Sequence, residues 1–142
     1  MSSYLEKYNK DYEYGLECEK KLECKIQELA GCKLKKLKRY DCFDWTGETE
    51  KILIELKSNR SKKTKYKYAI VGYNKITQGL EMLKQGYKIL FIFKYEDGLY
   101  KWYLTEDTIK NIHIKQSGRC DRYKKEYKPY ALIPREYLIE II

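Results

Sequence analysis

The chain has 142 residues with 30 Lys or Arg against 21 Asp or Glu, which gives a formal net charge of +9. Its length suits a single domain with a modest core, and no stretch approaches the ~20 apolar residues of a membrane helix or the apolar segment of a signal peptide. Five cysteines without a C-x-x-C pair and one histidine, His113, argue against a zinc or iron–sulfur site and against histidine-based catalysis.

The first predicted element is an amphipathic helix over residues 11–31. Gly31 stands where a C-cap belongs, and apolar residues recur at helical spacing: Tyr12, Leu16, Leu22, Ile26, Leu29 and Ala30. Glu19 lies within this apolar stripe, nearly over Ile26, whereas Glu17 falls on the polar side. Because a carboxylate in a core-facing stripe is costly without a cationic partner, Glu19 either belongs to a site, pairs with a lysine or tilts out to solvent.

Two short strands are expected next. Residues 33–40 alternate basic and apolar residues, which predicts a strand with its basic residues outward. Residues 42–45 form a second short strand, and residues 46–50 make the turn that follows. Asp44 is a better candidate ligand than Asp41, because Asp44 stands between large aromatic residues rather than in the preceding turn.

The third strand, residues 51–58, carries two charges in a pattern otherwise typical of a buried strand. Glu55 and Lys57 are two residues apart and therefore share one face, together with Leu53. An exposed face with a cross-strand ion pair is one explanation. The large aliphatic residues on both faces favour the other, in which Asp44, Glu55 and Lys57 converge at an active site.

The middle of the chain continues with a basic, tyrosine-containing loop over residues 59–70. A second amphipathic helix is expected from Tyr73 to Gln85, with Gly86 ending it. Residues 89–93 form a buried strand, and the Asp97-Gly98 turn joins it to a partner strand over residues 99–104.

The C-terminal third gives weaker signals. We expect a short helix over residues 105–111, a strand over residues 112–114 and a basic, tyrosine-rich loop or arm over residues 116–130. Pro134 is expected to begin a last short helix over residues 135–142.

Asp44 followed by Glu55-Leu56-Lys57, with an element order of helix, three strands, helix and two strands, resembles the PD-(D/E)xK nuclease superfamily. The resemblance implies an α/β fold of the restriction-endonuclease type, with an αβββαβ core and a mixed sheet flanked by helices. The segment from Gly15 to Lys20 also looks like the one that opens archaeal Holliday-junction resolvases. The resemblance covers residues 11–104 of one nuclease-like domain, and residues 105–142 form a basic arm and a closing segment.

The resemblance implies a metal-dependent endonuclease of resolvase-like or structure-specific type. Asp44, Glu55 and the Leu56 carbonyl would hold Mg²⁺ or Mn²⁺, and Glu19 would complete the site directly or through water. Lys57 would orient the attacking water or stabilise developing charge. A homodimer is implied as well, since symmetric cutting of two strands needs two sites.

The expected substrate is DNA, with RNA left open, and the phosphate backbone would be held by basic residues: Arg60, Lys62, Lys63, Lys65, Lys67, Lys75, Arg119, Arg122, Lys124 and Lys125. An odd number of cysteines without a secretory signal favours free thiols in a reducing compartment that contains DNA, such as the cytoplasm. Two alternatives stay open. One is a catalytically inactive nuclease-fold module that binds nucleic acid or protein, and the other is a basic accessory protein of unrelated fold.

Overall fold

The computed structural model describes residues 3–38, 41–47, 49–118 and 127–141. Two α-helices, α1 (Ser3–Ala30) and α2 (Tyr73–Lys84), accompany three short 3₁₀ helices: η1 (Lys63–Lys65), η2 (Thr108–Asn111) and η3 (Arg135–Tyr137). The strands are β1 (Lys35–Lys36), β2 (Trp45–Gly47), β3 (Ile52–Ser58), β4 (Tyr68–Gly72), β5 (Lys88–Tyr95), β6 (Gly98–Leu104), β7 (His113–Gly118), β8 (Tyr127–Pro134) and β9 (Ile139–Glu140).

The larger sheet is mixed and has the order β1-β2-β3-β5-β6-β9. Strands β3 and β5 are parallel, with Glu55 opposite Phe91 and Lys57 opposite Phe93, and the other pairs are antiparallel. Helix α2 lies in the connection between β3 and β5, as a parallel crossover requires. Since β3 and β5 occupy the middle of the sheet, the Glu55-Leu56-Lys57 segment lies on a central strand.

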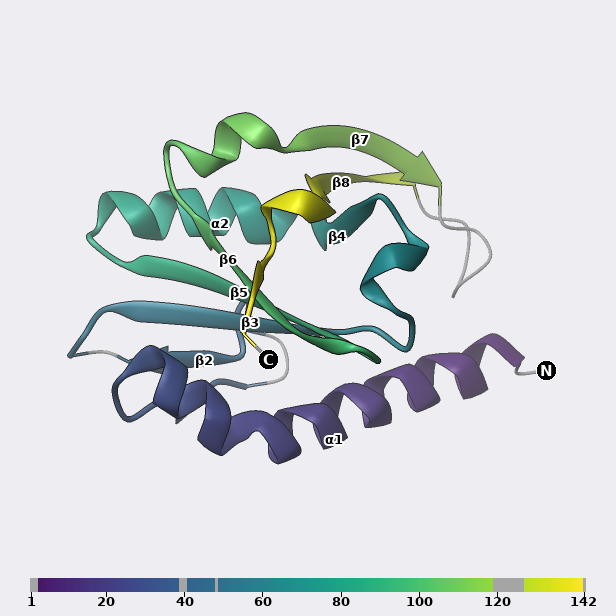
Figure 1. Ribbon diagram of the computed structural model, residues 1–142, viewed down its shortest axis with the longest axis horizontal. Helices are drawn as coiled ribbons and strands as arrows, with labels where there is room; N and C mark the ends of the chain where they lie inside the picture. Colours follow the sequence, from purple (N-terminus) through teal and green to yellow (C-terminus); the bar gives the residue numbers. More distant parts are fainter. Residues whose placement is uncertain (1–2, 39–40, 48, 119–126, 142) are drawn as a thin grey trace.

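The molecule has three layers (Figure 1). Helix α1 covers one face of the large sheet, and α2 covers the other together with a small antiparallel sheet of order β4-β8-β7. The mixed sheet between helices confirms the predicted restriction-endonuclease-like α/β fold. Within the described residues, no helix combines the length and apolar character needed to cross a membrane.

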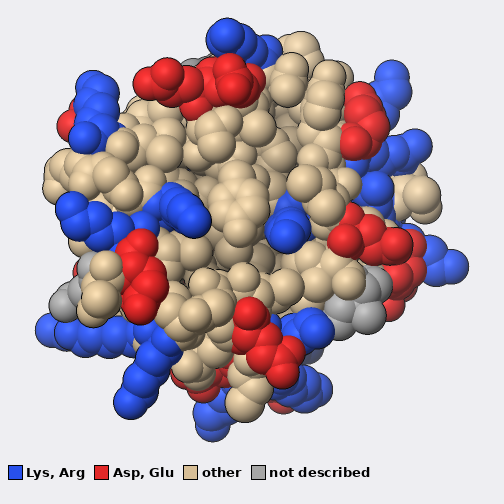
Figure 2. All heavy atoms as spheres, turned by 60° about the vertical axis from the view of Figure 1, so that its left-hand side comes forward, with Lys and Arg blue, Asp and Glu red and all other residues tan. Residues whose placement is uncertain are grey.

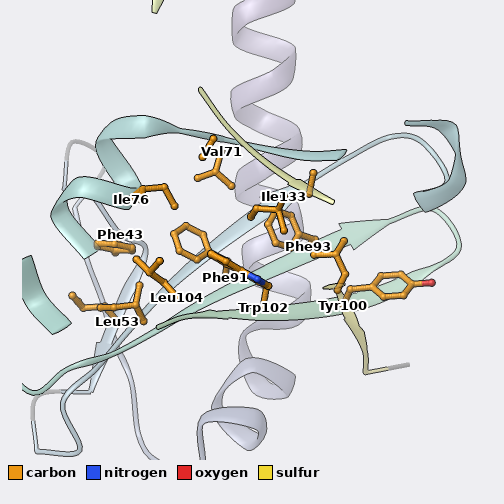
Figure 3. Close-up of a cluster of buried hydrophobic side chains, with 14 of the residues drawn as sticks. Phe43, Leu53, Val71, Ile76, Phe91, Phe93, Tyr100, Trp102, Leu104 and Ile133 are labelled. Atoms are coloured by element: carbon orange, nitrogen blue, oxygen red, sulfur yellow. The ribbon is translucent and has the colours of Figure 1, made fainter. Parts of the chain in front are cut away.

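Apolar side chains fill both spaces between the layers. The cluster beneath α2 and the small sheet includes Phe91, Phe93 and Trp102 of the large sheet and Ile76 of α2 (Figure 3). Gly79 allows α2 to approach β6 closely, because a Cβ there would stand 2.7 Å from Leu104 Cδ2. The cluster beneath α1 has alternate residues of the same strands: Ile52, Ile54, Leu56, Leu90 and Ile92.

Helix α1 ends as predicted but begins earlier, and one residue of the expected apolar stripe is exposed. It begins at Ser3, and Gly31 follows it with φ +71°, a left-handed conformation that favours glycine. Leu16 is 41% exposed, so its place in the predicted apolar stripe is wrong, whereas Cys18 and Ile26 are buried against the sheet.

Helix α2 and the β5–β6 hairpin confirm their predictions within three residues at each end. The loop expected over residues 59–70 is wrong in part, because it contains η1 and most of β4. The expected last helix is also wrong: only η3 forms, and β9 then pairs with β6. The loop or arm expected over residues 116–130 is wrong in part, because it contains the end of β7 and the start of β8, whose Ala131 and Ile133 are fully buried.

Candidate active site

Asp44 lies at the point where β3 extends beyond the end of β2. It directly precedes β2 rather than lying within a strand, and its N–H donates to the Ile54 carbonyl at 2.9 Å. Its Oδ2 accepts a hydrogen bond from the Leu56 N–H at 2.8 Å. The Asp44 carboxylate therefore replaces the missing strand partner of β3 and is held beside the residue that follows Glu55.

Glu55 projects from β3 toward α2, on the same face as the buried Leu53. Its side chain is 14% exposed and its Oε1 lies 3.4 Å from Lys75 Nζ of α2, which also donates to the Cys42 carbonyl. Burial is the main cause that raises the pKa of Glu55 to about 8. The Asp44 charge raises this pKa as well, whereas the charges of Lys75 and Lys57 and the hydrogen bond from Lys75 lower it. The two carboxylates of the motif therefore interact strongly.

Glu19 reaches the same region from α1. Its side chain is 16% exposed and forms an ion pair with Lys36 of β1, whose Nζ also lies 3.7 Å from Asp44 Oδ1. Burial raises the pKa of Glu19, against the hydrogen bond from Lys36 that lowers it, and the Asp44 charge raises it again. Lys36 thus links Glu19 to Asp44, and Glu17 is exposed as predicted.

Lys57 shares the strand face of Glu55, and its charge acts on the Glu55 carboxylate. It also lines a groove of about 790 Å³, which we call the Lys57 groove. The lining residues are Asp11, Tyr14, residues 57–61, Lys65, Tyr66, residues 68–70, Tyr95, Lys115, Tyr130 and Leu132. The motif lysine therefore stands at the junction of the carboxylates and a large open groove.

The predicted basic residues divide into four groups. Lys75 enters the site itself, and Arg60 is held by α1 through the Lys10 carbonyl at 3.0 Å and Asp11 at 3.7 Å. The loop lysines lie at the surface around η1: Lys62, Lys63, Lys65 and Lys67. The remaining candidates lie outside the described residues: Arg119, Arg122, Lys124 and Lys125.

Lys36 is the site residue that sequence reasoning missed. The alternating pattern over residues 33–40 predicted outward-facing lysines, and the strand there is only two residues long. The register of β1 against β2, which only the structure shows, pairs Lys36 with Trp45 and so places it beside Asp44. Pairing of the first two strands would have placed one lysine next to the candidate ligand.

The donor set suits a hard divalent cation. Among the described residues, no three carboxylate, histidine or cysteine side chains are grouped closely enough to hold a metal ion. Asp44 and Glu55 nevertheless interact, and in this structure the ammonium groups of Lys36 and Lys75 offset their charge. Two carboxylates with the adjacent Leu56 carbonyl are oxygen ligands of the kind that Mg²⁺ and Mn²⁺ prefer.

Divalent ions should therefore stabilise the folded chain. We expect Mn²⁺ or Mg²⁺ at about 100 times its Kd to add about 2.7 kcal/mol to the free energy of unfolding, since an ion that binds only the native state stabilises it by mass action. Thermal unfolding with and without the ion measures this. The increase should shrink in Glu55→Gln and persist in Glu136→Gln, which alters an exposed glutamate of η3. Equal increases in all three proteins would contradict the site.

No curated protein sequence matches this chain. A family model described as "Phage putative PDDEXK endonuclease" does match, over residues 6–134. The match includes most of α1, both carboxylates of the motif, Lys57 and both sheets up to the end of β8. The sequence motif, the mixed sheet and this match agree, and the chain belongs to this family of PD-(D/E)xK endonucleases.

Proposed function

We propose that the chain is a metal-dependent endonuclease that hydrolyses phosphodiester bonds in DNA and is of resolvase-like or structure-specific type. The observation that carries this proposal is the hydrogen bond from the Leu56 N–H to Asp44 Oδ2. It fixes the first carboxylate of the motif against the strand that carries Glu55 and Lys57. An inactive nuclease-fold module would have no need to keep these three charged groups together at a cost in burial.

Each side chain then has a role in the reaction. Asp44, Glu55 and the Leu56 carbonyl would hold the ion, with Glu19 reaching it directly or through water. A bound divalent ion lowers the pKa of water and neutralises charge that develops on the phosphate. Lys57 would orient the attacking water or stabilise that charge, and Lys75 would keep the Glu55 carboxylate in position.

Cleavage assays test this function. Linear, nicked and four-way-junction DNA are incubated with the full chain and Mg²⁺, Mn²⁺ or EDTA, and the double variant Asp44→Asn, Glu55→Gln serves as the inactive control. Ion-dependent cutting by the unaltered chain alone supports the proposal, and the preferred substrate separates a resolvase from a general nuclease. Binding without cutting under every condition would instead support the inactive module.

We also propose a homodimer, because symmetric cutting of two strands needs two sites. Light scattering of the chain alone and with a four-way junction measures the mass directly. A monomer in both samples would contradict a symmetric resolvase and favour cutting of one strand at a time.

Phosphate contacts by the basic loop should make DNA binding salt-sensitive. Charged side chains of both signs are interspersed on the face shown in Figure 2, so no broad basic patch dominates there. Lys62 and Lys67 are exposed on the loop around η1. We expect Lys62→Gln, Lys67→Gln to make the slope of log K against log salt shallower by about 1–2, since each phosphate contact contributes about 0.9.

Fluorescence anisotropy over a range of salt concentrations measures that slope. The matched control is Lys84→Gln, Lys110→Gln, because both of these lysines are exposed and belong to other elements, α2 and η2. A slope that is the same in both double variants would show that the loop lysines do not contact phosphates.

A further inference from the structure

The Lys57 groove combines positive charge with aromatic surface. Four cationic side chains line it, Lys57, Arg60, Lys65 and Lys115, against one carboxylate, Asp11. Five tyrosines line it as well: Tyr14, Tyr66, Tyr68, Tyr95 and Tyr130. A positive groove with aromatic rings is the combination that binds single-stranded nucleic acid, because the charge follows the backbone and the rings stack on bases.

The small sheet forms one wall of the groove through its outer face. Strand register places Ile70 opposite Leu132 and Tyr130 opposite Lys115, and all four side chains line the groove. Alternate residues of the same strands, such as Val71 and Ala131, point into the core. The wall therefore presents apolar and aromatic groups to the groove. A surface that bound only phosphates would need cationic groups and no aromatic rings.

Helix α1 and the loop after β3 form the opposite wall. The Arg60 guanidinium lies 4.5 Å from the centre of the Tyr14 ring, and Lys94 Nζ lies 3.4 Å from the Tyr14 hydroxyl. These contacts join Tyr14 to two residues that lie much later in the chain, the second of them 80 positions away, and hold the wall in place. The N-terminal half of α1, β4 and β8 all lie toward the same end of the molecule (Figure 1).

An unsatisfied polar atom lies in the groove next to the motif. The Ser58 hydroxyl directly follows Lys57, is buried, and has no hydrogen-bond partner among the described residues. Buried hydroxyls normally have a partner, so a water or ligand atom that reaches this hydroxyl would complete its hydrogen bonding. Tyr66 is 57% exposed and Ile70 is 38% exposed, which leaves apolar surface open to a ligand that can cover it.

We propose that the Lys57 groove binds a single-stranded segment of DNA that leads to the scissile phosphodiester, so that the substrate contains unpaired nucleotides beside the cut. The position of the unpaired nucleotides beside the cut rests on the proposed nuclease function, whereas binding of a single strand in the groove does not. A duplex hides its base faces in the stack and offers the tyrosine rings only base edges, phosphates and sugars. The groove, at about 790 Å³, has room for a few nucleotides of one strand, since pockets of about 300–1,000 Å³ enclose small ligands.

Binding is measured in EDTA, where metal-dependent cutting is absent, by anisotropy of a labelled 12-nucleotide thymidine strand, a hairpin duplex and a forked duplex. We expect the strand and the fork to bind at least about fivefold more tightly than the hairpin. Tyr66→Ala should lose about fivefold or more in affinity for the strand, since removing one stacking ring typically costs that much. Tyr137→Ala is the matched control, because Tyr137 is 45% exposed and lies outside the groove.

A second pair of variants separates stacking from folding. Tyr68→Phe keeps the ring and should keep strand affinity, whereas Tyr68→Ala should lose it; thermal unfolding of both variants identifies any loss of fold. Cleavage of the fork with Mn²⁺ is measured separately. Strand binding that depends on the tyrosines, without cleavage, would support single-strand binding in the groove and contradict the proposed nuclease function. Equal affinity for strand and hairpin, or a strand affinity that Tyr66→Ala leaves unchanged, would contradict single-strand binding in the groove even if duplex DNA is cut.

Discussion

Glu55→Gln is expected to lower DNA cleavage about 10³-fold while making the metal-free protein more stable at alkaline pH. The loss of activity follows from the loss of a charged ligand, because a divalent ion contributes several kcal/mol of charge stabilisation to phosphodiester hydrolysis and about 1.4 kcal/mol corresponds to tenfold in rate. Glutamine keeps the size of the side chain and one carbonyl oxygen. The loss of cleavage activity is therefore not expected to come from altered packing around the buried Leu53 and Phe91.

The gain in stability follows from the raised pKa of Glu55. Burial first, and then the Asp44 charge, raise that pKa to about 8 in the folded chain, against an ordinary value of 4.5. Folding therefore favours the protonated acid, and the free energy of unfolding falls as pH rises from about 4.5 through 8. Each pKa unit corresponds to about 1.4 kcal/mol, so glutamine should remove a penalty of a few kcal/mol at pH 9 and almost none at pH 4.

Denaturant unfolding in EDTA and a thiol reductant at pH 4, 7 and 9 measures this difference. Lys75 still donates to the Cys42 carbonyl in the variant, so its ammonium keeps one partner. Glu136→Gln should match the unaltered chain in both stability and cleavage, because Glu136 is exposed on η3. If Glu55→Gln were less stable than the unaltered chain at pH 9, the buried carboxylate would be a net stabilising group. The assignment of Glu55 as a buried ligand whose charge destabilises the metal-free fold would then be wrong.

The sequence predicted the parts of the fold that depend on local patterns. The β5–β6 hairpin follows from its Asp97-Gly98 turn, and α2 follows from its apolar repeat. The placement of Glu55 and Lys57 on one strand face follows from the alternation of side chains along a strand. These signals lie within a few residues of one another. Asp44 could be chosen over Asp41 for the same reason, since its neighbours Phe43 and Trp45 are buried.

What the sequence could not predict depends on pairing between distant segments. Lys36 becomes a site residue only because β1 pairs with β2 and α1 lies across them, and Lys75 reaches Glu55 only because α2 packs on that face. Strand β8 was hidden in a stretch that is polar and basic on average, although Ala131 and Ile133 enter the core. Its partner β4 lies some 60 residues earlier in the chain, so no local sequence pattern predicts the small sheet.

Asp44→Asn is expected to reduce cleavage as strongly as Glu55→Gln, by about 10³-fold, with little change in stability. The amide oxygen of asparagine can still accept the hydrogen bond from the Leu56 N–H, which is 2.8 Å long in the unaltered chain. The ion pair with Lys36 is lost, but that pair is 3.7 Å long with Lys36 41% exposed, and exposed pairs contribute only about 0–1 kcal/mol. The charge that holds a divalent ion is removed, and with it the stabilisation of the phosphate.

Asp44→Ala separates the two roles of this side chain. It should lose as much activity as Asp44→Asn and in addition about 1–3 kcal/mol of unfolding free energy, because the partly buried Leu56 N–H then has no acceptor at the end of β2. Cleavage rates with Mn²⁺ and denaturant unfolding at pH 7 are measured on both variants. Asp41→Asn is the control for charge, since Asp41 bonds the exposed Lys38 N–H instead. Cleavage retained in Asp44→Asn would remove Asp44 from the metal site, and equal stability of the asparagine and alanine variants would show that its hydrogen bond does not hold β3.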